Sequence, residues 1–226
     1  MLRIRKMRFE DIRFAVKLSD QERWGIPRSD FERILLQSAR GSFVACYGAK
    51  RVGLTTTATF GKKLAWIGNV IVDRGYRGED VGQNLVQHAL EYLQGSRVEH
   101  IGLYCFEETA RFYEKLGFLR NGRFLRMARR PRPTDQRPRL SFLRPPSLNN
   151  VLGADAKAFG VDRSRLIRLV LSRKEGWYLG PSHGPGNTCY LMVKEYGDMC
   201  EYGPWICIRP RESEPEEMLL NALMKR

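Results

Sequence analysis

The stretch that decides the fold is GNVIVDRGYRGEDVGQ, which occupies residues 68–83. An apolar run over 64–72 enters it, a polar loop rich in glycine and arginine follows, and an amphipathic pattern begins at Gly82. This pattern predicts a strand over 64–72 and a helix after the loop. Such a helix start offers free N–H groups and a positive dipole end to an anion, although an ordinary strand–loop–helix connection remains an alternative.

The flanking segments predict alternating strands and helices. N-terminal to the loop, the patterns indicate a strand over 2–8, helices over 10–23 and 30–40, and strands over 42–47 and 52–60. The helix over 30–40 should begin with a capping box formed by Ser29 and Glu32. C-terminal to the loop we expect a strand over 100–106, a helix over 108–116 that Gly117 caps, and a closing strand or hairpin over 118–128.

The composition limits the partners and the compartment. The chain has 226 residues and a net charge of +14, which points to an anionic partner. No apolar run is long enough to span a membrane and arginines interrupt the N-terminus, so we expect a cytoplasmic protein. The five cysteines form no C-x-x-C pair, so neither a metal site nor a disulfide framework is expected, and reduced, mostly buried thiols are the favoured interpretation for Cys46, Cys105, Cys189, Cys200 and Cys207.

The decisive loop resembles the acetyl-CoA motif of the GNAT superfamily of acyltransferases, a strand followed by Q/R-x-x-G-x-G/A and a helix. Arg77 matches the first position and Gly82 the last, whereas Asp80 stands where the family usually has glycine. Beside Glu79, a carboxylate there would face a pyrophosphate, and like charges repel. The resemblance implies that acetyl-CoA, as cosubstrate, contacts Val70, Ile71, Val72, Arg77, Gly78, Glu79, Asp80, Val81, Gly82 and Gln83.

A second stretch, ETARFYEKLGF over residues 108–118, resembles the family's A-x-x-F-Y-x-x-x-G-F helix and turn. The resemblance implies that Tyr113 is catalytic and gives a proton or a hydrogen bond to the departing thiolate of CoA. The alternative is an aromatic residue on the core face of a helix. Together the two motifs imply a GNAT domain over 1–128, an α/β (α+β) fold with a mixed, mostly antiparallel sheet flanked by helices.

A general base is not evident in this domain. The strand over 64–72 carries no acid, and Asn69, at the usual depth for a base in the family, cannot take a proton at neutral pH. His88 and His100 have suitable chemistry. We expect both to be solvated or structural, because His88 lies among polar residues of a helix and His100 precedes a strand.

An arginine- and proline-rich linker is predicted over 129–147. From Arg120 to Arg144 there are nine arginines and one acid, Asp135, a net charge of +8. Binding of nucleic acid is one interpretation. An extended, solvated connector is favoured because stacking aromatic residues are scarce there.

Residues 148–226 predict a smaller α+β unit. Asp162 should cap a helix that carries Leu166 and Ile167, strands should follow near 176–180, 187–194 and 199–208, and Ser213 should open a last helix.

The stretch DAKAFGVDR, residues 155–163, resembles the D-x-x-x-F-G-x-D-R signature of two-part GNAT proteins, whose second unit is GNAT-like but lacks a cofactor loop. We expect this unit to supply acceptor contacts from Arg163, Tyr202 and Trp205. The alternative is a packing unit with Phe159 and Trp205 in the core, Asp162 as a cap and Arg163 on the surface.

The functional hypothesis is an N-acetyltransferase that moves acetyl from acetyl-CoA to a primary amine of a small molecule or protein. The competing hypothesis is a degenerate GNAT domain that serves as a binding or regulatory module, for instance on nucleic acid. Asp80 and the arginine-rich linker are the features that favour the second.

Overall fold

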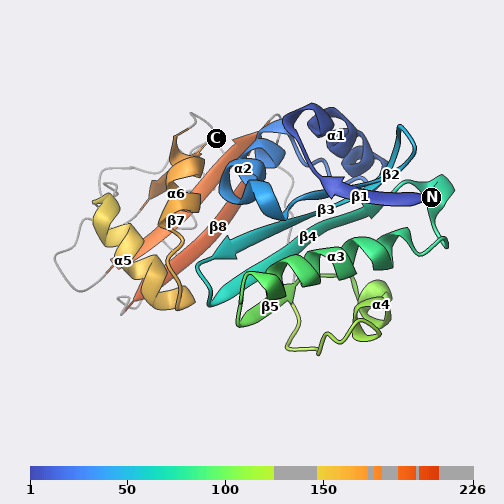
Figure 1. Cartoon of the computed structure of the whole chain (residues 1–226). Helices are drawn as coiled ribbons and strands as arrows, with labels where there is room; N and C mark the ends of the chain where they lie inside the picture. Colours follow the sequence, from blue (N-terminus) through green and yellow to red (C-terminus); the bar gives the residue numbers. More distant parts are fainter. Residues whose placement is uncertain (125–146, 173–175, 180–187, 197–198, 209–226) are drawn as a thin grey trace. The chain divides into compact units, whose positions relative to one another are not determined.

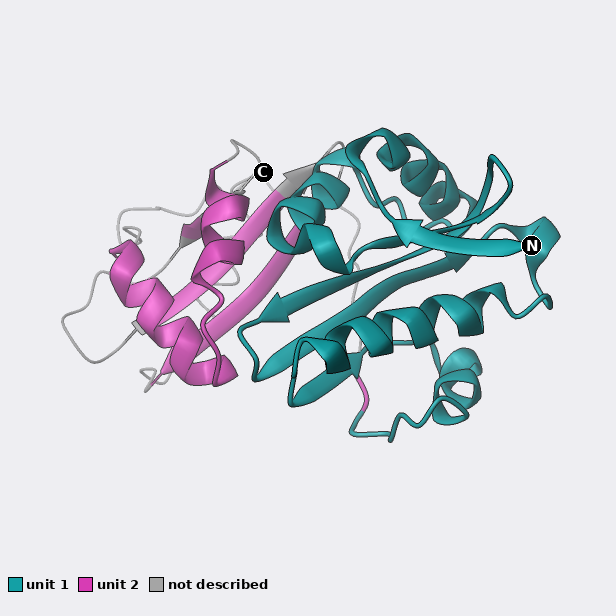
Figure 2. Ribbon diagram, viewed as in Figure 1, with its two compact units in different colours: residues 1–122 teal, residues 123–226 magenta. Residues whose placement is uncertain are grey.

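The computed structural model divides the chain into two compact units, Met1–Gly122 and Arg123–Arg226 (Figure 2). It describes residues 1–124, 147–172, 176–179, 188–196 and 199–208. Each unit has its own sheet and its own hydrophobic core.

A five-stranded sheet in the order β1-β2-β3-β4-β5 forms the centre of the first unit (Figure 1). Neighbouring strands are antiparallel except β4 and β5, which are parallel. This confirms the mixed, mostly antiparallel sheet. The strands are β1 (Leu2–Lys6), β2 (Phe43–Tyr47), β3 (Lys50–Phe60), β4 (Leu64–Val72) and β5 (His100–Leu103).

Helices cover both faces of this sheet (Figure 1). On one face, α1 (Ile12–Gln21) and α2 (Arg28–Ser38) bury residues such as Phe31 and Leu35 against strands β2, β3 and β4. On the other face, α3 (Val81–Gly95) packs Leu85 and Ala89 against β2, β3 and β4. The short helix α4 (Ala110–Glu114) follows β5. Single 3-10 turns η1 (Phe9–Asp11), η2 (Ala39–Gly41), η3 (Arg74–Tyr76) and η4 (Glu107–Thr109) complete the unit.

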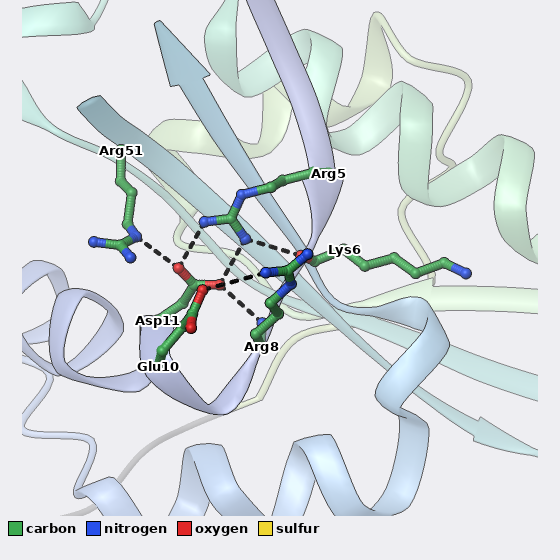
Figure 3. A network of polar contacts seen from close by, with 6 residues as sticks. All are labelled: Arg5, Lys6, Arg8, Glu10, Asp11 and Arg51. Atoms are coloured by element: carbon green, nitrogen blue, oxygen red, sulfur yellow. Dashed lines mark hydrogen bonds and ion pairs between the residues drawn. The ribbon is translucent and has the colours of Figure 1, made fainter. Parts of the chain in front are cut away.

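A buried carboxylate fastens the start of α1 to the sheet (Figure 3). Asp11 accepts two hydrogen bonds from Arg5 of β1, at 2.7 and 2.8 Å, and one of 2.6 Å from Arg51 of β3. The backbone N–H of Arg8 donates a fourth, at 2.8 Å. Burial alone would raise the pKa of Asp11, but the bonds from Arg5, Arg8 and Arg51 lower it to about 2.

The second unit has a three-stranded antiparallel sheet of β6 (Gly176–Leu179), β7 (Thr188–Tyr196) and β8 (Met199–Ile208). Two helices, α5 (Leu148–Phe159) and α6 (Ser164–Leu171), belong to it. Val151 of α5 and Ile167 of α6 pack with Tyr190 and Met192 of β7 to form its core. A small α+β unit is thus present.

Several predicted element boundaries differ from the structure. Helix α2 begins at Arg28 with Pro27 as its N-cap, so the capping box of Ser29 and Glu32 is wrong. Proline presets the extended conformation of that position, and the helix starts directly after it. Residues 118–124 form no strand, and 125–128 lie outside the described residues. Helix α5 was not predicted, although its last residues, from Asp155 to Phe159, belong to the stretch DAKAFGVDR.

The prediction of reduced, mostly buried cysteines is partly wrong. Cys189 and Cys207 form a disulfide, since the register of β7 and β8 places them opposite each other although they are 18 residues apart in sequence. Cys46 is free and buried, whereas Cys105 is free and exposed. A cross-strand pair of this kind leaves no spacing signal, because register depends on the fold.

Two predicted segments lie almost wholly outside the described residues. The linker over 129–147 is described only at Ser147, whose hydroxyl accepts a hydrogen bond from the N–H of Asn150 and caps α5. The predicted helix from Ser213 is not described. In the described part of the chain, no helix has both the length and the apolar character that a membrane crossing requires.

Candidate active site

Strand β4 separates from β5 halfway along its length. Residues 64–67 pair with β5, but β4 continues to Val72 after β5 has ended at Leu103. On its other side, the pairing of β4 with β3 shifts by one residue near Asn69, which has a φ of 50°. Such a bulge bends the strand. Residues 68–72 therefore have no strand partner on the β5 side within the described chain.

Threonines of β3 hold this bulge in place. The hydroxyls of Thr55 and Thr56 donate to the carbonyl of Gly68, at 3.2 and 3.3 Å. The side-chain amide of Asn69 donates to the hydroxyl of Thr56 at 3.0 Å. The run of threonines thus stabilises the irregular part of β4. The hydrogen bond of the Asn69 side chain is a structural contact, which agrees with the expectation that Asn69 is not a base.

The loop from β4 to α3 presents its backbone in the conformation of an anion site. Gly78 has a φ of 85° and Asp80 a φ of 55°, so both are left-handed. A glycine at the position of Asp80 would adopt this conformation without strain. The carbonyl of Asp80 accepts the first helical bond of α3, from the N–H of Asn84 at 2.9 Å. The N–H groups of the first helical turn precede that bond and have no helical acceptor: they belong to Val81, Gly82 and Gln83.

The two arginines of the loop are bound to the end of α1. Arg77 contacts the carboxylate of Glu22 at 2.5 Å and donates to the carbonyl of Val72 at 3.2 Å. Arg74 lies 3.5 Å from the same carboxylate and donates to the carbonyl of Gln21 at 2.6 Å. The two arginines thus tether the loop to α1 and share one acid.

Tyr47 of β2 lies close to Glu79 of the loop. Burial and, after it, the Glu79 carboxylate raise the pKa of the Tyr47 hydroxyl. The Tyr47 ring also stacks on Tyr76 of the loop, with ring centroids 5.6 Å apart, and the Lys50 ammonium lies 4.8 Å from the Tyr76 centroid. Tyr47 and Lys50 thus both contact the loop through the ring of Tyr76.

Tyr113 lies on α4, beside the start of α3. Burial raises its pKa to about 12, and the nearby Cys105 thiol adds to the rise, so the hydroxyl keeps its proton at neutral pH. Phe112 and Phe118 contact its ring edge-on, with centroids 4.9 and 6.1 Å away. A side-chain carbon at Gly82 would lie 3.6 Å from the ring of Phe112. The fold thus brings the two predicted motifs together.

The two histidines occupy structural positions, as expected. His88 is half-buried and packs edge-on against Phe43, with ring centroids 4.6 Å apart. His100 is exposed and pairs with Leu64, at the opposite end of β4 from the bulge.

The signature of the second unit surrounds a buried acid. Asp155 accepts hydrogen bonds from Arg163, at 3.0 and 2.5 Å, and from the hydroxyl of Tyr190. The Arg163 guanidinium also lies 3.2 Å from the centroid of the Phe159 ring. Asp162 accepts the N–H of Ser164 at 2.8 Å, but the N-cap of α6 is Arg163, so Asp162 holds the first turn of the helix from the position before the cap.

Two details of the packing alternative are wrong. The Arg163 side chain is 14% exposed, because Asp155 draws it inward. Phe159 and Trp205 are each 42% exposed and are not core residues. Tyr202 of β8 is half-buried. The acceptor role of Arg163, Tyr202 and Trp205 stays a prediction.

Two aromatic pairs of the first unit were not predicted from the sequence. Trp24 contacts Phe106 with centroids 6.2 Å apart, and Trp66 stacks on Tyr104 at 4.5 Å. Tyr104 and Phe106 come one and three residues after β5 ends at Leu103. Two aromatic residues just after a strand were the feature of the sequence from which these pairs could have been predicted.

Comparison with known proteins supports this arrangement. A sequence model of the acetyltransferase (GNAT) family matches residues 7–118, whereas no curated protein matches the chain. A proposed acetyltransferase of Pyrococcus horikoshii shares the fold over 98% of this chain and 75% of its own, at 22% identity and a TM-score of 0.69.

Two further solved structures are similar over the first unit. Ard1 from Thermoplasma volcanium covers 54% of this chain and 84% of its own, at 18% identity and a TM-score of 0.51. Rv2747 from Mycobacterium tuberculosis, solved with CoA and NLQ, covers 53% and 73% at 20% identity and a TM-score of 0.47. Three observations agree: the match of the family model, the separation of β4 from β5, and the glycine-bearing loop before α3. Residues 7–118 form a domain of the acetyltransferase (GNAT) family.

Proposed function

We propose that the first unit transfers an acetyl group from acetyl-CoA to a primary amine. The observation that carries the proposal is the meeting of three elements at Gly82, in the first turn of α3: a side-chain carbon there would lie 3.6 Å from Val72 at the end of β4 and 3.6 Å from Phe112, the neighbour of Tyr113 on α4. The first turn of α3 has N–H groups without a helical acceptor, and the hydroxyl of Tyr113 keeps its proton. Membership of the GNAT family supports the same chemistry.

The loop before α3 fits the pyrophosphate of CoA. The N–H groups of residues 81–83 and the dipole of a 15-residue helix favour an anion there. Glu79 and Asp80 are the acids of this loop that would oppose an anion there. We propose that CoA contacts Val70, Ile71, Val72, Arg77, Gly78, Glu79, Asp80, Val81, Gly82 and Gln83.

Different residues of this chain would carry out different parts of the reaction. When bound, acetyl-CoA would supply the acetyl group as a thioester. Backbone N–H groups of residues 70–72 would polarise the thioester carbonyl. Tyr113 would hold a proton on its hydroxyl oxygen and give it, or a hydrogen bond, to the departing sulfur. Since β4 carries no acid, the amine would have to arrive neutral or release its proton to water.

Replacement of Tyr113 by phenylalanine tests this role. We expect Tyr113→Phe to lower kcat by about a hundredfold while the Kd for acetyl-CoA, measured by calorimetry, stays the same. Tyr92→Phe on α3 is the matched control and should leave kcat unchanged. An unchanged kcat for Tyr113→Phe would make Tyr113 a packing residue, and no acetyl-CoA binding by the wild type would overturn the proposed function.

Replacement of Asp80 tests the fit of the loop. Asp80→Asn removes the charge and tolerates the left-handed conformation, whereas Asp80→Gly also removes the strain. We expect both variants to lower the Kd for acetyl-CoA about three- to tenfold, with the larger decrease for Asp80→Gly. A tenfold change in Kd corresponds to only about 1.4 kcal/mol. Weaker binding by both variants would show that the Asp80 carboxylate helps to hold the cofactor.

A further inference from the structure

We infer that Glu22 is a positioning residue for the loop before α3, residues 73–80, and that it acts on this loop through Arg77. The inference rests on the proposed acetyl transfer and gives a role in the same site to a residue outside the loop. Glu22 is the C-cap of α1, and its side chain is 21% exposed. It lies outside both sequence motifs of the first unit, so no local pattern marks it.

Both arginines of the loop fasten it to the end of α1. Arg77 contacts the Glu22 carboxylate at 2.5 Å and donates from its Nε to the carbonyl of Val72, the last residue of β4. Arg74 lies 3.5 Å from the same carboxylate and donates to the carbonyl of Gln21. Cations at the C-terminal end of a helix also interact favourably with its dipole. The Glu22 carboxylate thus connects the end of α1 to the end of β4 by way of Arg77.

The loop needs this support because part of its backbone is strained. Asp80, three residues after Arg77, has a φ of 55°, a left-handed conformation that costs energy in a residue with a side chain. Such a conformation persists only where the surrounding contacts maintain it. Gly78 lies between the two and, as a glycine, offers little conformational resistance of its own. The ion pair of Glu22 is therefore placed to hold the loop in the conformation that leaves the first N–H groups of α3 free.

Glu22 also has an opposite effect, because it offsets the positive charge of the arginines. Residues 73–83 contain two arginines and three acids, so their side chains offer a pyrophosphate no net positive charge. Both arginines lie at the surface, where the side chain of Arg74 is 67% exposed and that of Arg77 is 48% exposed. Charges this exposed are screened by water and by salt, so the unfavourable effect of Glu22 on an anion is small.

The support of the loop should outweigh the loss of charge. A loop that already has its binding conformation avoids the entropy cost of becoming ordered when the ligand arrives. Ordering even one free residue costs more than an exposed ion pair contributes. Glu22 should therefore raise the affinity for acetyl-CoA, although it is an acid beside an anion site.

Hydrogen exchange tests the loop without any ligand. The amide protons of Tyr76 and Asn84, on either side of Arg77, donate to backbone carbonyls at 2.9 Å and report on opening of the loop. We expect both to exchange about threefold faster in Glu22→Gln than in the wild type, as measured by NMR. Unchanged exchange in Glu22→Gln would overturn the inference.

Calorimetry with acetyl-CoA measures the effect on binding. Glu22→Gln should raise the Kd about five- to tenfold, and Glu22→Asp, which keeps the charge, should recover part of the affinity. Asp20→Asn is the matched control for both experiments. It removes one negative charge from the same helix at an exposed residue that forms no ion pair within the described part of the chain, and it should leave the exchange rates and the Kd unchanged.

A double variant distinguishes this role from a general effect on the stability of α1. Arg77→Gln should also weaken binding, and the addition of Glu22→Gln to it should weaken binding little further, because Glu22 acts through Arg77. Full additivity of the two substitutions, or a Kd in Glu22→Gln equal to or below that of the wild type, would overturn this inference alone. No binding of acetyl-CoA by the wild type would overturn the proposed function as well.

Discussion

The two units each bury an aspartate near a helix end, and the partners of these aspartates differ. Asp11 in the first unit is held by Arg5 and Arg51, which come from two strands, and by a backbone N–H. Asp155 in the second unit is held by Arg163, eight residues along the chain, and by the neutral hydroxyl of Tyr190. Both carboxylates are fully buried, so each depends on its partners for the solvation it has lost.

The difference concerns how many charges compensate the acid. Asp11 has two guanidinium groups, both partly exposed, and the loss of one leaves the other. Asp155 has one, and that guanidinium is itself largely buried. The hydroxyl of Tyr190 donates a hydrogen bond but no charge, and burial together with that bond raises the pKa of Tyr190. The second unit should therefore be the more sensitive to loss of its acid.

Removal of Asp155 should have the largest effect. We expect Asp155→Asn to lower the free energy of unfolding of the second unit by about 3–5 kcal/mol, because it leaves Arg163 buried without a counter-charge. Denaturant unfolding measures this loss. Glu201→Gln breaks the more exposed pair with Lys194 and is the control, with an expected loss under about 1 kcal/mol. A loss for Asp155→Asn as small as that for Glu201→Gln would contradict the prediction that the second unit is sensitive to loss of its buried acid.

The disulfide of the second unit should have the next largest effect. Cys189→Ala combined with Cys207→Ala should cost about 3 kcal/mol, since the bond closes a loop of 18 residues. A reducing agent should lower the stability of the wild type but leave the double variant unchanged. Cys105→Ser replaces a free, exposed thiol and serves as the control. A wild type insensitive to reduction would show that the bond adds no stability.

Acid should weaken the first unit by a smaller amount. The pKa of Asp11 is lowered from 3.8 to about 2 on folding, so its contribution to stability is present above pH 4 and is lost as the pH falls toward 2. The expected loss is about 2 kcal/mol, at about 1.4 kcal/mol per pKa unit. The free energy of unfolding of Asp11→Asn should lack this part of the pH dependence. Asp20→Asn, at an exposed residue of α1, is the control and should retain it.

Segments with strong local patterns were predicted well from the sequence. The strand over 64–72, the helix that follows it and the left-handed Gly117 are confirmed, because apolar periodicity and glycine conformation depend on nearby residues. The predicted strand over 118–128 failed in its described part, since the apolar residues there have no partner strand in the described chain. Helix α5 was missed because Asn149, Asn150 and Gly153 are weak helix formers.

The sequence by itself determined the local chemistry of the loop before α3: an apolar strand, glycines, and a helix start, all within one short segment. Only the tertiary structure decided how distant residues meet. It bound Arg77 to Glu22 and Cys189 to Cys207, and it stacked Tyr47 on Tyr76. Such contacts depend on strand register and on the packing of helices, and no local spacing records them.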